Sequence, residues 1–156
     1  MPDMPITPEV AATLMAQVFA LVRACPSGRV TTYSAIAKTL GFPRGARMIG
    51  WIMQETPAGG DVPAQRVVSS TGELSGSWAF AMPNTMREVL ESEGILFNAD
   101  GKVDLKRFGW EPQRDLTDEQ LRDVLAKAEP IAGTISQRLM YKLCNDVASP
   151  FRVGKS

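Results

Sequence analysis

The chain has 156 residues, of which 44% are hydrophobic and 22% are charged, as is typical of one soluble globular domain or of one domain with an appendage. It contains no histidine, which excludes Ser-His-Asp and Cys-His catalysis and most zinc sites, and we expect neither a metal nor a cofactor. No apolar run approaches the roughly 18 residues of a membrane span, and the first residues lack the features of a secretory signal. Two distant cysteines, Cys25 and Cys144, lead us to expect a reduced, cytoplasmic setting.

The formal net charge is zero, but the charges are unevenly distributed. Between Arg23 and Gly72 there are six basic residues and two acidic ones, a local balance of +4. Such a patch is compatible with weak electrostatic contact to phosphates. On composition alone, ordinary surface charge is the better explanation.

The first predicted elements are helical. Thr7-Pro8-Glu9 has the residues of a helix start, and apolar residues at helical spacing continue to Cys25. A short helix follows, capped by one of the threonines at 31–32 and ended by Gly41, and a second covers 46–54. Two short helices joined by a glycine-containing turn form a helix-turn-helix pattern, although many other helical hairpins share it.

The remaining elements alternate hairpins and helices. We expect a small hairpin or wing at 67–74 that turns near Thr71-Gly72, a helix at 83–93, and a hairpin at 95–105 that turns at Asp100-Gly101. A capping box at 117–120 begins another helix, and a last helix is expected from 131 to about 147. The predicted fold is mainly α with small β hairpins: a winged-helix-like helix-turn-helix domain at 1–114 and a helical C-terminal extension at 115–156.

Five motifs in one order carry a family resemblance: GRVTTYSAIA at 28–37, ARMIG at 46–50, VPAQRVV at 62–68, TGELSG at 71–76 and LESEGI at 90–95. Together they resemble the DNA-binding domain of the O6-alkylguanine-DNA alkyltransferases over roughly residues 10–112. GKVDL at 101–105 and GWEP at 109–112 resemble the ending of the alkyltransferase-like proteins in particular. The resemblance implies a protein that binds double-stranded DNA.

The chain departs from the enzymes at the motif that carries their chemistry. The enzymes have Pro-Cys-His-Arg-Val, in which the cysteine accepts the alkyl group and the histidine helps to form the thiolate. Here Ala64 and Gln65 replace them, and an alanine methyl has no lone pair with which to attack an alkyl carbon. The resemblance therefore implies a non-enzymatic protein that binds O6-alkylguanine by base flipping and marks it for nucleotide excision repair proteins, acting as a monomer.

The resemblance also implies roles for individual residues. Arg47 would be the finger that fills the gap left by the flipped nucleotide, and Tyr33 would press on the neighbouring phosphate. Without the resemblance, a surface arginine and a half-buried tyrosine would be the ordinary interpretations. The small residues Ala46 and Gly50 would let the helix approach the DNA backbone. With Arg44, these residues make up the predicted DNA-binding set.

The predicted pocket for the alkylated base is built around the elbow at 63–67. Its residues are Pro63, Ala64, Gln65, Arg66, Val67, Ser75, Ser77 and Trp78. Trp78 is compatible with either a pocket wall or a core position. Glu93 matches the acid of the enzymes' hydrogen-bond relay, and with Gln65 in place of histidine we expect it only to order the elbow.

Two other functions remain open from the sequence. A helix-turn-helix regulator without lesion recognition would prefer one DNA sequence and gain nothing from an alkyl group. An enzyme of altered chemistry would remove the alkyl label from the DNA or transfer it to protein. The second is disfavoured, because the elbow has neither cysteine nor histidine.

Overall fold

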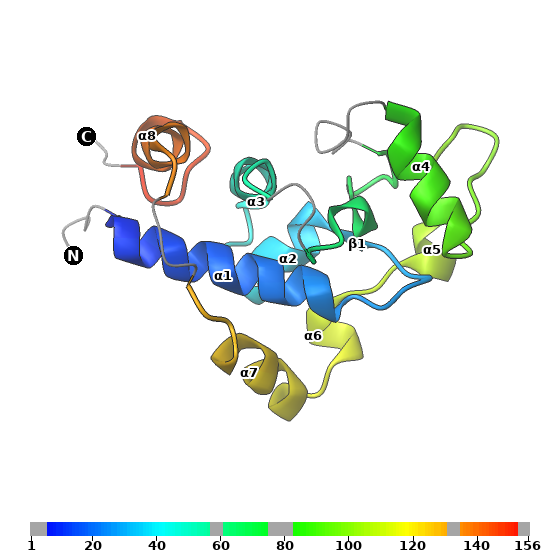
Figure 1. The fold of residues 1–156 in the computed structure, drawn as a ribbon, viewed down its shortest axis with the longest axis horizontal. Helices are drawn as coiled ribbons and strands as arrows, with labels where there is room; N and C mark the ends of the chain where they lie inside the picture. The colour runs from blue at the N-terminus through cyan, green and yellow to red at the C-terminus, as the bar shows by residue number, and fades with distance from the viewer. Residues whose placement is uncertain (1–5, 57–60, 75–82, 131–134, 153–156) are drawn as a thin grey trace.

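The computed structural model describes residues 6–56, 61–74, 83–130 and 135–152, with the backbone alone at 83–85 (Figure 1). Within these ranges the chain forms eight α-helices, one short 3-10 helix and a two-stranded sheet. The mainly helical fold class predicted from the sequence is confirmed. No helix among these residues is long and apolar enough to cross a membrane, and no cluster of side chains in them could hold a metal ion.

Helix α1 (Pro8–Ala24) runs through the middle of the molecule (Figure 1). Its start is fixed locally, because the Thr7 hydroxyl accepts the Val10 amide at 3.2 Å and Pro8 occupies the first turn, where no amide is needed. Val18, Leu21 and Val22 are fully buried on this helix. It therefore serves as the support against which α3 and α7 pack.

Helices α2 (Tyr33–Thr39) and α3 (Ala46–Met53) form the predicted helix-turn-helix pair. The Thr32 hydroxyl accepts the Ala35 amide at 3.0 Å and caps α2. Gly41 follows the end of α2 with φ of 92°, a backbone conformation that favours glycine. The buried residues of α3, including Met48, Ile49 and Ile52, face α1 and α2.

The sheet pairs two short strands in parallel, with β1 (Thr31–Thr32) opposite β2 (Val67–Val68). This differs in detail from the hairpin expected at 67–74. The turn is present, closed by a bond from the Ser69 amide to the Glu73 carbonyl at 2.9 Å, but the paired partner of β2 is β1. Both valines of β2 are buried, so the strand is placed inside the molecule, as parallel strands usually are.

A second, smaller core lies under α4 (Pro83–Ser92) and the following hairpin. It is formed by Val30, Val68, Leu90, Ile95, Val103 and Phe108. The predicted hairpin at 95–105 is confirmed in short form by a bridge between Phe97 and Val103 and by Gly101 with φ of 78°. Two single-turn helices, α5 (Leu105–Phe108) and α6 (Pro112–Asp115), lead toward the extension.

The C-terminal extension contributes α7 (Asp118–Ala126) and α8 (Gln137–Asn145). The capping box of Thr117 and Gln120 is present as predicted. Helix α8 is shorter than the expected 131–147, because the Ser136 hydroxyl accepts the Leu139 amide and the helix begins after this cap. At its other end Asp146 is extended and its carboxylate accepts the Ala148 amide. Residues 131–134 lie outside the described ranges.

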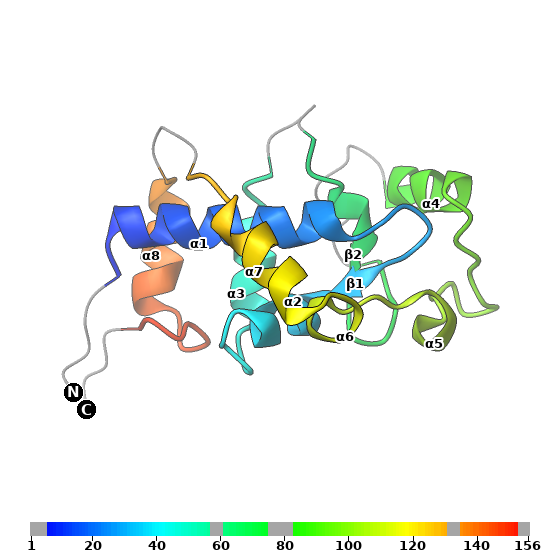
Figure 2. The ribbon, with the colours of Figure 1, turned by 90° about the horizontal axis from the view of Figure 1, so that it is seen from below.

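The two helices of the extension lie on opposite sides of α1. Figure 1 shows α7 below α1, while α3 and α8 lie side by side above it, and Figure 2 shows α7 against α1 from below. Leu139 and Leu143 of α8 are buried in the same core cluster as α1 and α3. The extension therefore wraps around α1 and closes the core next to α3.

Candidate nucleic-acid interface

An open groove of about 530 Å³ runs along the exposed face of α3. Four of the five residues predicted to contact DNA lie in it: Tyr33, Ala46, Arg47 and Gly50. The rest of its lining comes from Ser34, Trp51, Gln54, Ser69, Ser70 and Lys142. The parallel pairing of β1 with β2 brings the start of α2 next to Ser69 and Ser70 and so completes one side of the groove.

Arg47 is in the first turn of α3 and its side chain is exposed. Within the described ranges it takes part in no hydrogen bond or ion pair. Nothing lies within 4 Å of the position that a Cβ atom would occupy on Gly50, one turn further along. The helix therefore presents a long cation beside an uncovered stretch of backbone, which a second macromolecule can approach closely.

Tyr33 and Arg44 occupy different positions around α3. Tyr33 is half-buried at the start of α2 and packs against the main core. Arg44 is exposed in the turn before α3, outside the groove, where it borders a second depression with residues 147–150. The predicted DNA-binding set is thus split between the groove and the second depression.

The elbow at 63–67 has a defined backbone geometry. Pro63 has φ of −80° and ψ of 72°, and the Ala64 amide donates to the Val62 carbonyl at 2.8 Å, which is an inverse γ-turn. The 3-10 helix η1 (Ala64–Arg66) follows and leads directly into β2. Ala64 is 9% exposed and packs against the main core, so the elbow presents a nearly buried methyl group at this position.

Glu93, at the end of α4, holds the two polar side chains of the elbow. Its carboxylate accepts hydrogen bonds from Gln65 Nε2 at 2.9 Å and from Arg66 Nε and Nη2 at 3.0 and 3.1 Å. Arg66 Nη1 donates to the Cys25 carbonyl at 2.9 Å and so ties the elbow to the end of α1. Glu93 has the ordering role expected of it, and each of the three guanidinium nitrogens of Arg66 is bonded within the protein.

The negative charge of Glu93 is stabilised by its hydrogen-bond partners in this network. Burial alone would raise the pKa of Glu93, but the hydrogen bonds and positive charge of Arg66 and the hydrogen bond from Gln65 outweigh burial and lower it below its ordinary value of 4.5. Glu93 is therefore an anion near neutral pH. An anion paired with a permanently charged guanidinium and a neutral amide offers no group that exchanges a proton in that range.

Cys25 lies next to the elbow, where its carbonyl accepts a hydrogen bond from Arg66, but its thiol is not an activated nucleophile. Its side chain is fully buried, and burial raises the pKa of its thiol to about 12, although Arg66 and Arg29 act in the opposite direction. The thiolate is the reactive form, so this thiol is inert near neutral pH. Among the described residues the elbow therefore has no activated nucleophile.

Ser75, Ser77 and Trp78, which were predicted to line the base pocket, lie outside the described residues. Conversely, the groove includes residues for which the sequence predicts no role, most notably Lys142 from the extension. Its spacing from Leu139 and Leu143 places it off the buried face of an amphipathic helix, but only the packing of α8 beside α3 reveals its position.

The helix-turn-helix, the elbow tied to Glu93 and the exposed arginine define a DNA-binding domain of the alkyltransferase type. The family model described as "6-O-methylguanine DNA methyltransferase, DNA binding domain" matches residues 13–95, and the chain belongs to this family. The chain is 36% identical over 96 residues to the DNA base-flipping protein of Escherichia coli, covering 60% of this chain and 71% of that protein. It is 31% identical over 100 residues to Alkyltransferase-like protein 1 of Schizosaccharomyces pombe, covering 62% and 93%.

Among solved structures, the chain is similar to that of S. pombe Atl1 in complex with damaged DNA containing O6-carboxymethylguanine. The TM-score is 0.56 at 30% sequence identity, and the match covers 64% of this chain and 95% of that chain. Proteins named methylated-DNA–protein-cysteine methyltransferases are also among the matching relatives. The family thus includes both enzymes and proteins named for base flipping.

Proposed function

We propose that this protein binds O6-alkylguanine in double-stranded DNA, flips the damaged base toward the elbow and does not repair it. The observation that carries the proposal is the pairing of a preserved scaffold with a lost nucleophile. The elbow keeps its hydrogen bonds to Glu93, while Ala64 fills the nucleophile position. The likeness to a solved complex with damaged DNA supports the same function.

In this proposal α3 enters a groove of the DNA and Arg47 occupies the stack vacated by the flipped nucleotide. Flipping costs a few kcal/mol and costs less for a weakly paired, damaged base, which favours the lesion over guanine. Tyr33 presses on the neighbouring phosphate, and Ala46 and Gly50 allow close approach of the backbone. Pro63, Ala64 and Val67 shape the wall behind the base, and Arg66 and Gln65 hold that wall in place through Glu93.

The bound complex would then mark the lesion for nucleotide excision repair. A non-enzymatic sensor needs such a hand-over, because the alkyl group stays on the DNA. Incision of a lesion duplex by excision-repair nucleases, compared with and without this protein, tests the hand-over. Faster incision with wild-type protein but not with Arg47→Ala is expected, and an unchanged rate would contradict it.

Lesion recognition is tested by fluorescence anisotropy on two duplexes that differ only in O6-methylguanine or guanine, at fixed salt. We expect the wild type to bind the lesion duplex at least about tenfold more tightly, and Arg47→Ala to lose most of that preference. Arg122→Ala is the matched control, since Arg122 is an exposed arginine on α7, on the far side of α1. It should bind as the wild type does.

Equal binding of the wild type to both duplexes would contradict the proposal and favour a sequence-specific helix-turn-helix regulator. Recovery of the DNA after binding separates the sensor from an enzyme. We expect O6-methylguanine to be recovered intact and the protein mass to be unchanged. Loss of the methyl group from the DNA would show an enzyme of altered chemistry.

A further inference from the structure

Helix α8 lies outside the part of the chain that matches the family, yet it reaches the groove. The family match ends at residue 95, whereas Lys142 lines the same groove as Tyr33, Arg47 and Gly50. The Lys142 ammonium lies 5.8 Å from the centre of the Trp51 ring, above the neighbouring helix α3. Lys142 therefore belongs to the same surface as the predicted DNA-binding residues.

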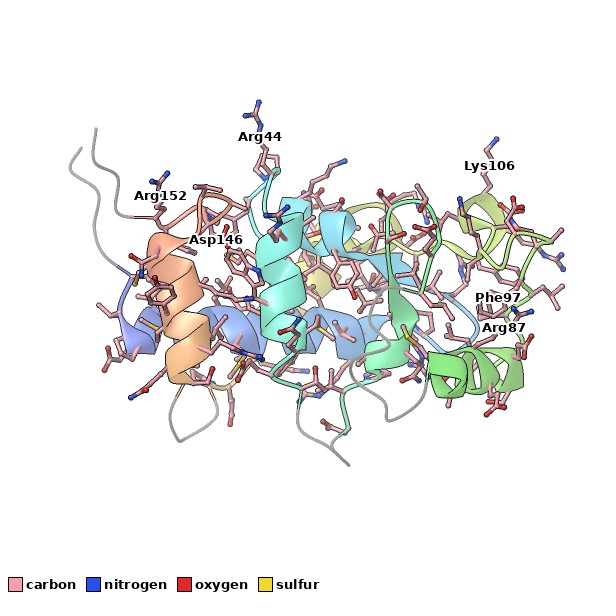
Figure 3. The ribbon with its side chains drawn as sticks, turned by 90° about the horizontal axis from the view of Figure 1, so that it is seen from above. Arg44, Arg87, Phe97, Lys106, Asp146 and Arg152 are labelled. Carbon is pink, nitrogen blue, oxygen red and sulfur yellow. The ribbon has the colours of Figure 1, made fainter. Side chains whose placement is uncertain are left out.

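Helix α8 is held firmly in this position. Leu139 and Leu143 are 2% and 0% exposed and insert into the core beneath α1 and α3. Beyond the helix, the Phe151 ring packs edge-on against Phe42 in the helix-turn-helix turn, with ring centres 5.3 Å apart. Figures 1 and 3 both show α8 beside α3. The lysine is thus presented from a fixed support.

The charges around the groove favour an anionic partner. Among the described residues that line it, Arg47 and Lys142 are the two charged ones, and none of these residues is a carboxylate. The acidic residues nearest in sequence to Arg47 and Lys142 contact other groups. Glu55 faces Arg138 at 3.7 Å, and Asp146 accepts the Ala148 amide at 2.8 Å. Within the described ranges Lys142 has no ion pair.

We propose that α8 is part of the DNA interface and that Lys142 binds a backbone phosphate. This phosphate lies beside the DNA groove that α3 enters. This inference rests on the proposed function, and it assigns a role to an extension outside the matched family domain. When a helix enters a DNA groove, the surfaces flanking it face the phosphates on either side, and lysine is suited to such a contact as a compact point charge.

The segment after α8 carries a further cation, on the side of the molecule that also carries Arg44. Figure 3 shows Arg152 and Arg44 projecting in the same direction, one from the extension and one from the turn before α3. Both are exposed, and neither takes part in an ion pair within the described ranges. The extension therefore adds a cation on the side of the molecule that carries Arg44.

The test compares the salt dependence of DNA binding for the full-length wild type, Lys142→Ala and Lys142→Arg on lesion and undamaged duplexes. Loss of one phosphate contact reduces the slope of log K against log salt by about 0.9, which is about an eightfold loss of affinity near 0.1 M salt. We expect Lys142→Ala to show this loss equally on both duplexes and Lys142→Arg to restore binding. Lys127→Ala is the control, since Lys127 on the far side pairs with Asp123.

The outcomes separate this inference from the proposed function. If the wild type prefers the lesion and Lys142→Ala, with an unchanged melting temperature, keeps the wild-type affinity and slope, the role of α8 is wrong. If the wild type binds both duplexes equally and Lys142→Ala still reduces the slope, lesion recognition is wrong and the contact is supported. If the wild type binds neither duplex, both are wrong.

Discussion

The Arg66 guanidinium grips the Glu93 carboxylate through two nitrogens, with Nε–Oε1 and Nη2–Oε2 distances of 3.0 and 3.1 Å. The two side chains are only 16% and 12% exposed, and they join the elbow to the end of α4. A fork of this kind fixes the direction of both groups. The wall of the predicted base pocket is therefore held by a contact within the protein, which forms without DNA.

Replacing Arg66 by alanine should destabilise the protein strongly. The change leaves Glu93 partly buried without its main partner and the Cys25 carbonyl without its donor, which corresponds to a loss of roughly 2–4 kcal/mol in the free energy of unfolding. Arg23→Ala is the matched control, because Arg23 contacts Asp61 at the same 3.0 Å with side chains 42% and 78% exposed. That change should cost less than about 1 kcal/mol. Equal losses in urea unfolding would contradict the importance of the buried pair.

The same pair gives stability a defined dependence on pH. Hydrogen bonds from Arg66 and Gln65 overcome the effect of burial, so the folded-state pKa of Glu93 lies below its ordinary value of 4.5. The stabilisation is fully present above that value and is lost as pH falls through the folded-state pKa. We expect the stability difference between the wild type and Glu93→Gln to be constant above pH 4.5 and to shrink below it. A difference that grows on acidification would contradict this assignment.

The two cysteines should differ in reactivity. Cys25 is fully buried and burial raises the pKa of its thiol to about 12, whereas Cys144 is partly exposed. A thiol reagent near pH 8 should therefore modify Cys144 in the native protein and reach Cys25 only after unfolding. Cys144→Ser should show no fast-reacting thiol. Rapid modification of that variant without denaturant would show that the end of α1 is open.

Introducing the cysteine and histidine of the enzymes' motif should introduce alkyl transfer if the elbow is an intact scaffold. Ala64→Cys combined with Gln65→His is expected to accept a methyl group from O6-methylguanine DNA, measured as a gain of protein mass at residue 64. Ala64→Cys alone should react roughly 10²-fold more slowly, because Gln65 cannot take the thiol proton. A double variant that binds the lesion duplex but never gains mass would show that the base does not reach the elbow.

Gly72 anchors the turn after β2 and should not tolerate a side chain. Its φ is 89°, and a Cβ atom there would collide with the Val103 carbonyl oxygen. Gly41 has nearly the same φ, 92°, with nothing within 4 Å of its Cβ position. Gly41→Ala should therefore cost about 1 kcal/mol from backbone strain alone, and Gly72→Ala roughly 2–4 kcal/mol. Similar losses for the two would indicate that the turn shifts to relieve the contact.

Local signals were enough to predict most of the helices. Thr7 and Thr117 each cap a helix at the predicted position, because capping depends on residues three positions apart. Ser136 is the exception: the sequence pattern predicts the last helix from residue 131, whereas the Ser136 cap starts it at Gln137. The elbow residues could be named only through the family motif.

Contacts between distant segments could not be predicted. The pairing of Thr31 with Val67 and the position of Lys142 beside Trp51 depend on how whole elements pack, and no local spacing encodes them. For the same reason the sequence predicts an ordering role for Glu93 but not its fork with Arg66.

The position of α8 also affects the order in which the protein can mature. The core beneath α3 is sealed by Leu139 and Leu143, which are far from α3 along the chain. A nascent chain that has emerged only as far as α6 already contains the helix-turn-helix, but that core is still uncovered on one side. We expect this intermediate to be aggregation-prone and to depend on chaperones until residue 143 leaves the ribosome. The predicted DNA-binding surface along α3 would thus form late in synthesis, and unfinished chains would not bind DNA.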